Sequence, residues 1–176
     1  EAEETEMEKL AKAYREFLDK GKTERECVAE IVKEAEAAGY ESLESKLEKG
    51  EKIKAGDKVY AVGMKKIVAL FHVGTEELSG GMSILCAHID SPRLDVKQNP
   101  LYEDTDLAYL DTHYYGGVKK YQWVTLPLAM HGVVAKKDGS IVEISIGEDA
   151  EDPVLYITDL LIHLSVIYHI YNTDRI

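Results

Sequence analysis

The sequence has only two cysteines and four prolines among its 176 residues, and it has no long hydrophobic run. Cys27 and Cys86 cannot build a disulfide scaffold, and because both lie among apolar neighbours we expect reduced, buried thiols. A transmembrane helix needs about 18 or more consecutive apolar residues, so we expect no membrane partner. The polar, acidic N-terminus is unlike a signal peptide. Together these absences predict a cytoplasmic protein.

Basic residues are also scarce. The chain has 21 Lys and Arg residues against 33 Asp and Glu residues, which gives a formal net charge of −12. The charge is spread along the chain and no basic block stands out, so we expect no nucleic-acid partner. Apolar residues make up 45% of the chain. That share is typical of a globular protein and excludes a mostly disordered one.

Three helices are predicted at the start of the chain. Apolar residues recur at helical spacing from Met7 to Leu18, and Gly21 is expected to end that helix. Thr23 and Glu26 have the spacing of a capping box, which predicts the start of a second helix. A third, short helix is expected over residues 42–49.

Short apolar runs that follow the helices are typical of strands. Two are Val59–Val62 and Ile67–Phe71, and a third is Ile84–Ala87. The third run is continuously apolar, so we expect it to be buried on both faces in an α/β sheet. It leads directly into the polar residues 88–92. Open α/β sheets bind ligands at such carboxyl ends of strands.

The composition of the sequence changes after about residue 95. Five of the eleven tyrosines lie between Tyr102 and Tyr121. Val133 to Ile146 predicts a β-hairpin, with Asp138 and Gly139 in the turn. The predicted organisation is therefore helices and buried strands up to about residue 95, followed by a β-rich, aromatic-rich segment.

His88 and Asp90 form the best local signal for chemistry. An imidazole binds Zn²⁺ through one nitrogen, and a nearby carboxylate can orient the ring. By itself the pair is weak, because a structural His at a strand end is the more frequent explanation. Hydrogen-bonded structural roles are expected for three of the other histidines, and His113 is assigned equally to an interface loop or a tight turn. Those expected structural histidines include His72, His131 and His163.

Several segments together resemble a known family. They closely resemble the aspartyl aminopeptidase family of zinc metallopeptidases, whose bacterial branch is called aminopeptidase I. The resemblance extends along the chain to about residue 164. The segments that carry it are Cys86–Asp95, Asn99–Tyr102, Thr112–Gly117, Phe17–Glu26, Pro127–Gly132 and Thr158–Leu164.

The resemblance implies an α/β fold with two parts. Residues 1–95 would be the N-terminal part of an α/β/α metallopeptidase catalytic domain. Residues 96–164 would be an inserted β-rich dimerisation domain, and residues 165–176 an atypical apolar tail. The family implies a homo-oligomer, a dimer or a larger tetrahedral particle. It also implies removal of N-terminal residues, acidic ones in the aspartyl branch, from a peptide substrate.

The resemblance also implies roles for three residues. His88 corresponds to a ligand of a site that holds two metal ions, usually zinc, although other divalent metals are possible. Asp90 corresponds to the carboxylate behind that ligand. His163 corresponds to a histidine that reaches the active site of a neighbouring subunit and helps to hold substrate.

Two departures from the family affect the expected function. The family chain is much longer, and its bridging Asp, its Glu-Glu pair, a further acidic ligand and a C-terminal His have no counterpart here. Residues from Ser165 onward look unlike the family, which suggests a truncation with a replaced tail, such as a frameshift product, or one piece of a longer gene product. We therefore expect a zinc-dependent aminopeptidase that is truncated and inactive alone. The alternatives are a non-catalytic oligomerisation or interaction module from that family and a fragment that does not fold stably.

Overall fold

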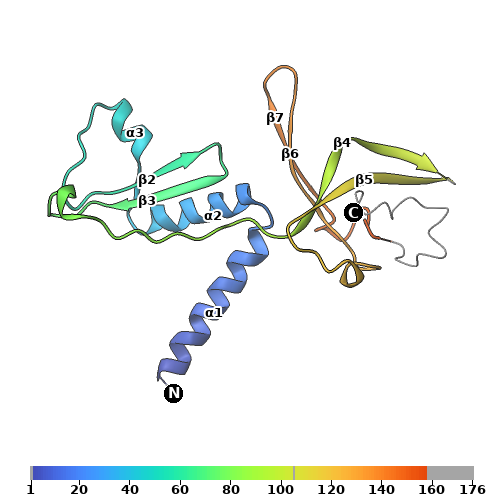
Figure 1. Cartoon of the computed structure of the whole chain (residues 1–176), viewed down its shortest axis with the longest axis horizontal. Coiled ribbons are helices and arrows are strands. Elements are labelled where there is room, and N and C mark those ends of the chain that lie inside the picture. The colour runs from blue at the N-terminus through green and yellow to red at the C-terminus, as the bar shows by residue number, and fades with distance from the viewer. Residues whose placement is uncertain (1, 105, 158–176) are drawn as a thin grey trace. The chain divides into compact units, whose positions relative to one another are not determined.

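The computed structural model describes residues 2–104 and 106–157, and it divides between Asp90 and Ser91 into two compact units (Figure 1). Each unit is a separate arrangement of helices or strands and is described by itself. His163 and the segment 165–176 lie outside the described residues. The described part is a mixed α/β structure, as the sequence predicts.

Two helices open the first unit as expected. Helix α1 (Ala2–Lys20) ends before Gly21, and helix α2 (Glu24–Ala37) begins after Thr23. The predicted capping box is confirmed. The Thr23 hydroxyl oxygen accepts the Glu26 N–H at 3.4 Å, and Glu26 Oε2 accepts the Thr23 N–H at 2.8 Å. These bonds satisfy two of the N–H groups that a helix start leaves without partners.

A third helix and a small sheet complete this unit. Helix α3 (Leu43–Glu48) starts at the capping residue Ser42, as predicted. Strand β1 (Glu41–Ser42) pairs in parallel with β2 (Lys58–Gly63), and β2 pairs in antiparallel with β3 (Ile67–His72). The core is formed by residues of α2 and β2. Its buried residues are Cys27, Val28, Ala35, Val59 and Tyr60.

The strand expected over Ile84–Ala87 is not formed, and this expectation is wrong. The chain there has no regular secondary structure, and Figure 1 draws it as a plain extended stretch between β3 and β4. Ile84 is 70% exposed and Leu85 is fully exposed. Cys86 is exposed too, whereas Cys27 is buried as expected. The physical reason is that a strand buried on both faces needs neighbouring strands and covering helices. No strand in the described part of the chain pairs with this segment.

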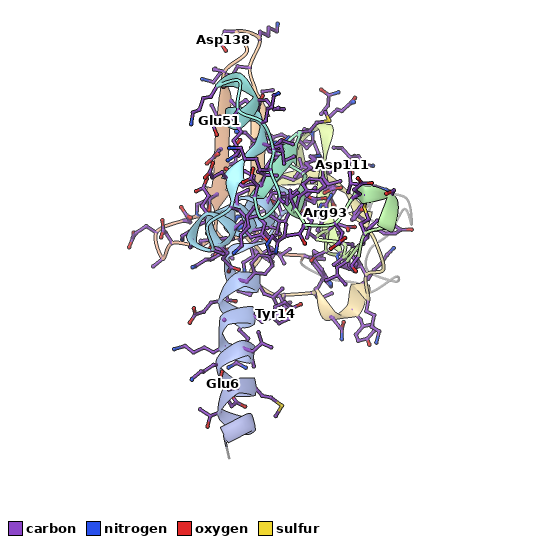
Figure 2. All side chains as sticks on the ribbon, turned by 90° about the vertical axis from the view of Figure 1, so that its left-hand side faces the viewer. Glu6, Tyr14, Glu51, Arg93, Asp111 and Asp138 are labelled. Atoms are coloured by element: carbon purple, nitrogen blue, oxygen red, sulfur yellow. The ribbon has the colours of Figure 1, made fainter. Side chains whose placement is uncertain are left out.

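The N-terminal part of α1 presents apolar side chains to solvent. Met7 is 65%, Leu10 72% and Tyr14 59% exposed. Figure 2 shows Glu6 and Tyr14 on this stretch of the helix, away from the sheet. Packing on an apolar face supplies most of a helix's stability in proteins, so α1 depends on its own backbone bonds here. Surface ion pairs such as Lys9–Glu6 at 2.8 Å add little.

Two antiparallel ribbons form most of the described part of the second unit. Strands β4 (Arg93–Asp104) and β5 (Leu107–Tyr115) pair with a register shift between Val96 and Leu101. Strands β6 (Met130–Ala135) and β7 (Ile141–Ile146) form the second ribbon. A single-turn 3₁₀ helix, η2 (Lys120–Gln122), lies between the two ribbons in sequence.

The turn between β6 and β7 confirms the predicted hairpin. Gly139 has φ 85°, a backbone conformation that glycine adopts without steric cost. The Asp138 carboxylate accepts the Ser140 N–H at 2.9 Å and the Ser140 hydroxyl at 2.6 Å. These bonds hold the pKa of Asp138 below its ordinary value. The turn is therefore closed by the hydrogen bonds of Asp138 and by the positive φ of Gly139, the two residues that the sequence places in it.

Candidate metal centre

His88 and Asp90 are in contact at the end of the extended segment. His88 Nδ1 lies 3.0 Å from the main-chain oxygen of Asp90 and 3.3 Å from its carboxylate Oδ1. A carbonyl oxygen can only accept a hydrogen bond, so Nδ1 must carry the proton. In the neutral ring, Nε2 then keeps a free lone pair. The His88 side chain is 84% exposed, which leaves that nitrogen open to an incoming group.

This arrangement suits a single zinc ligand. Metal-binding histidines donate their second ring N–H to a carboxylate or a main-chain oxygen, which fixes the tautomer and the ring orientation. His88 has both kinds of acceptor at one residue, Asp90. The zinc role itself remains a prediction from the sequence.

The rest of a zinc site is not assembled within residues 2–104 and 106–157. No group of three or more His, Cys, Asp and Glu residues there could hold a metal ion. A zinc ion takes about four ligands, so His88 supplies at most one of the donors that such a site needs.

A buried thiol contacts the same segment from α2. Cys27 Sγ lies 3.6 Å from the main-chain oxygen of Ile89 and 3.4 Å from that of Gly21. Burial raises the pKa of Cys27, and the charges of Glu26 and Glu24 raise it further. The thiol therefore stays protonated and can donate. Sequence reasoning identified Cys27 only as a buried thiol, because nothing local indicates a contact with a residue 62 positions away.

The other histidines of the described chain take separate positions. His131 on β6 lies with Nε2 2.9 Å from Glu148 Oε1, and its side chain is 11% exposed, which matches the expected structural role. His72 is exposed at the end of β3. His113 lies on β5 opposite Asp95, so the loop and the tight turn expected for it are wrong, and its place at an interface stays a prediction. The backbone pairing of β5 with β4 continues through His113 as far as Tyr115, so this residue is part of the strand.

The β4–β5 ribbon carries charged and aromatic pairs. The Arg93 guanidinium lies 4.2 Å from the centre of the Tyr115 ring, and Arg93 Nε donates to Asp95 Oδ1 at 2.7 Å. Lys97 Nζ and Asp111 Oδ2 are 3.4 Å apart. Figure 2 labels Arg93 and Asp111 on this ribbon. The contacts of Arg93 with Tyr115 and of Lys97 with Asp111 join the two strands, whereas the bond between Arg93 and Asp95 lies within β4.

Past the register shift, the ribbon exposes apolar side chains. Leu101 is 72% and Leu107 52% exposed. The rings of Tyr102 and Tyr109, on opposite strands, stack with centres 5.3 Å apart. Exposed leucines beside stacked tyrosines resemble the composition of interface cores.

None of the helices in the part of the chain that the structure describes is both long and apolar enough to cross a membrane.

Comparison with known proteins gives a consistent result. The sequence model of a family described as aminopeptidase I zinc metalloprotease (M18) matches residues 17–172. A curated protein of Clostridium acetobutylicum, named Probable M18 family aminopeptidase 1, is 60% identical over 156 residues. That match covers 89% of this chain and 34% of the other. The chain thus spans about a third of the length of the curated relatives that it matches.

Solved structures agree with the sequence matches. The crystal structure of aminopeptidase I from Borrelia burgdorferi B31 has a TM-score of 0.83 at 39% identity, over 92% of this chain and 39% of that one. The M18 family aminopeptidase structure from Thermotoga maritima has a TM-score of 0.81 at 47% identity, over 91% of this chain and 34% of that one.

The family match also corrects one expectation from the sequence. We expected the resemblance to end near residue 164, with a tail unlike the family from Ser165 onward. The matched region instead runs to residue 172. Most of the expected tail therefore falls inside the region that the family model matches.

Proposed function

The chain belongs to the aminopeptidase I zinc metalloprotease family (M18), and on that premise we propose that it acts as the N-terminal part of a zinc-dependent aminopeptidase. The observation that carries the proposal is the family match over residues 17–172. Because the chain spans about a third of its relatives' length, the activity is proposed for a protein in which further residues complete the site. The substrate class is a peptide with a free N-terminus, with acidic first residues preferred.

The described residues have defined parts in this proposal. His88 would bind zinc through Nε2, since its Nδ1 faces the two oxygens of Asp90. Asp90 would hold the ring in the required tautomer and make it a stronger ligand. When bound, zinc supplies Lewis acidity toward water and the scissile carbonyl group. His163 would help to hold substrate in a neighbouring subunit.

The domain roles follow the same proposal. Residues 1–95 would belong to the catalytic domain, and residues 96–164 would form the β-rich assembly domain. The ribbons of β4–β5 and β6–β7 support a β-rich second part. Residues 165–176 would lie beyond that domain.

A variant of His88 tests the catalytic proposal in the intact enzyme, the longer protein that carries this chain. His88→Ala should lose bound zinc and aminopeptidase turnover, because removing one of few ligands leaves the metal under-coordinated. Asp90→Asn should weaken zinc binding about 10–100-fold, as loss of a ligand's carboxylate partner typically does. His72→Ala, a matched change at an exposed histidine on β3, should keep both properties. Normal zinc content and activity in His88→Ala would overturn the assignment.

A second function, a non-catalytic oligomerisation module, is favoured by the exposed leucines of the β4–β5 ribbon. Leu101 and Leu107 are both more than half exposed. Light scattering of the purified chain should then show a dimer or a larger species. Leu101→Glu should lower the molar mass of that assembly towards the mass of one chain. Lys137→Glu, in the exposed loop between β6 and β7, provides a control with the same new residue. A strict monomer at high protein concentration would contradict this function.

A further inference from the structure

We propose that Cys27 is a positioning residue for His88: its buried thiol holds the Ile89 carbonyl and thereby fixes the chain turn in which Asp90 orients the imidazole. The catalytic meaning of this role rests on the proposed aminopeptidase function. The contact itself is a property of the first unit and is tested without metal or substrate.

The thiol is attached to a rigid support. Cys27 lies in the first turn of α2, and its N–H donates to the Thr23 carbonyl oxygen at 2.9 Å. Thr23 and Glu26 close the capping box around the same turn. The residue is 5% exposed. A side chain held on a capped helix start and covered by the core has little freedom to move away from its partners.

The thiol also has close neighbours on the side of α1. Gly21 follows α1, and its carbonyl oxygen lies 3.4 Å from Cys27 Sγ. A Cβ atom added at Gly21 would lie 2.7 Å from that sulfur, closer than side-chain carbons pack. Sγ thus fills the space between the end of α1 and the main chain at Ile89.

The segment that contains Ile89 has no regular secondary structure to hold its main chain in place. Its chain forms no strand, Leu85 is fully exposed, and the His88 side chain is 84% exposed. Ile89 lies between His88 and Asp90, so the direction of its carbonyl sets how the chain turns from one to the other. A buried donor on that carbonyl therefore bears on the distance of 3.0 Å between His88 Nδ1 and the Asp90 oxygen.

A thiol suits this position for a geometric reason. Sulfur forms longer hydrogen bonds than oxygen, and the two carbonyl oxygens lie at 3.4 and 3.6 Å. The thiol has one proton for two acceptors, so it donates to one of them at a time. A serine hydroxyl keeps a donor at this place but holds it farther from both carbonyl oxygens, because a C–O bond is shorter than a C–S bond, whereas alanine and valine remove the donor. These three substitutions separate donation from packing.

The experiment reads the tautomer of His88 in the full 176-residue chain without metal. Long-range proton–nitrogen NMR distinguishes an imidazole protonated at Nδ1 from one protonated at Nε2, and His88→Gln assigns the signal. The parent chain should show the Nδ1–H form. Cys27→Ala and Cys27→Val should both shift the ring towards the Nε2–H form, and Cys27→Ser should shift it less than either, because it keeps a donor at a longer distance. Val28→Ala is the control, because Val28 is 4% exposed on the same helix and its loss perturbs the core alone.

Each outcome supports or overturns the proposal. A shift in both variants that lack the donor, with a smaller shift in Cys27→Ser and no change in Val28→Ala, supports it. An unchanged tautomer in Cys27→Ala or Cys27→Val overturns it, as does an equal shift in Val28→Ala, which would mean general loosening of the unit. If Cys27→Ala does not fold by circular dichroism, the valine and serine variants decide. Failure of the aminopeptidase proposal would leave this tautomer result standing, so the two are tested separately.

Discussion

Tyr60 on β2 donates its phenolic proton to Glu36 Oε1 on α2 over 2.7 Å. The bond joins the helix to the sheet at the edge of the core, where Tyr60 is 9% exposed. The hydrogen bond to Glu36, burial, and the negative charge of Glu36 all raise the pKa of Tyr60 above its ordinary value. On the same strand, Lys58 Nζ donates to the Ala38 carbonyl oxygen at 3.2 Å, past the end of α2. The two contacts fix which face of β2 meets the helix.

Tyr60→Phe should lower the free energy of unfolding by about 1–2 kcal/mol, because it removes a hydrogen bond to a charged acceptor. The tyrosine also gives the stability a pH dependence. Its pKa is higher in the folded than in the unfolded chain, so its contribution is complete below about pH 10 and is lost as the pH rises through the folded-state pKa. Between pH 8 and a pH above 10, the urea midpoint of the parent should decrease more than that of Tyr60→Phe. Parallel midpoints in the two proteins would contradict the role of this bond.

Two valines on β2 provide a matched test of where the core lies. Val59 is 2% exposed and Val62 is 41% exposed. Val59→Ala should cost about 2 kcal/mol, because it removes buried methyl groups and leaves a cavity. Val62→Ala should cost less than about 1 kcal/mol, since much of that side chain is already in water. Equal losses in urea unfolding would mean that Val59 is not part of the core as described.

The capping box of α2 should be visible in stability. Thr23→Ala removes the hydroxyl that accepts the Glu26 N–H, and such losses cost about 1 kcal/mol. Thr23→Ser keeps the hydroxyl and should remain close to the parent. Chemical denaturation followed by circular dichroism measures both variants. A Thr23→Ala protein as stable as the serine variant would argue against the cap.

Local patterns in the sequence predicted the elements that local chemistry stabilises. The capping box at Thr23 and Glu26 needs only residues three apart, and the turn at Asp138 and Gly139 needs only its own dipeptide. Both are present in the structure. Such motifs are readable because the groups that satisfy each backbone N–H or carbonyl are neighbours in the chain.

The strand predicted over Ile84–Ala87 is wrong because a strand depends on neighbouring strands that the local sequence does not reveal. A continuous apolar run indicates burial, but a strand forms only where other strands accept its backbone hydrogen bonds. The described strands pair in three separate sheets, none of which includes this run. The contact between His88 and Asp90 could be predicted from their spacing. The contact of Cys27 with Ile89 could not, because tertiary packing alone brings them together.

The 176-residue chain alone is expected to lack aminopeptidase activity. A site with two metal ions needs several ligands and a base, and the described residues offer no group of three possible ligands. Self-association would not help, because every copy lacks the same residues. Metal analysis of the purified chain should find little zinc, and a peptide with N-terminal Asp or Glu should remain uncut. Stoichiometric zinc with turnover, in a preparation whose mass shows this chain only, would falsify this expectation.

The exposed stretch around Leu85 has a consequence for the lifetime of the chain. Proteases bind their substrates as extended, unpaired peptides, and exposed segments of that kind are preferred sites of cleavage. Residues 81–87 have no regular secondary structure, and Leu85 is fully exposed. A brief digestion with a protease that cuts after leucine should therefore cleave there before it cleaves within α2 or β2. The same apolar residues that indicated a buried strand would then mark a site at which the polypeptide is cut before its folded core is.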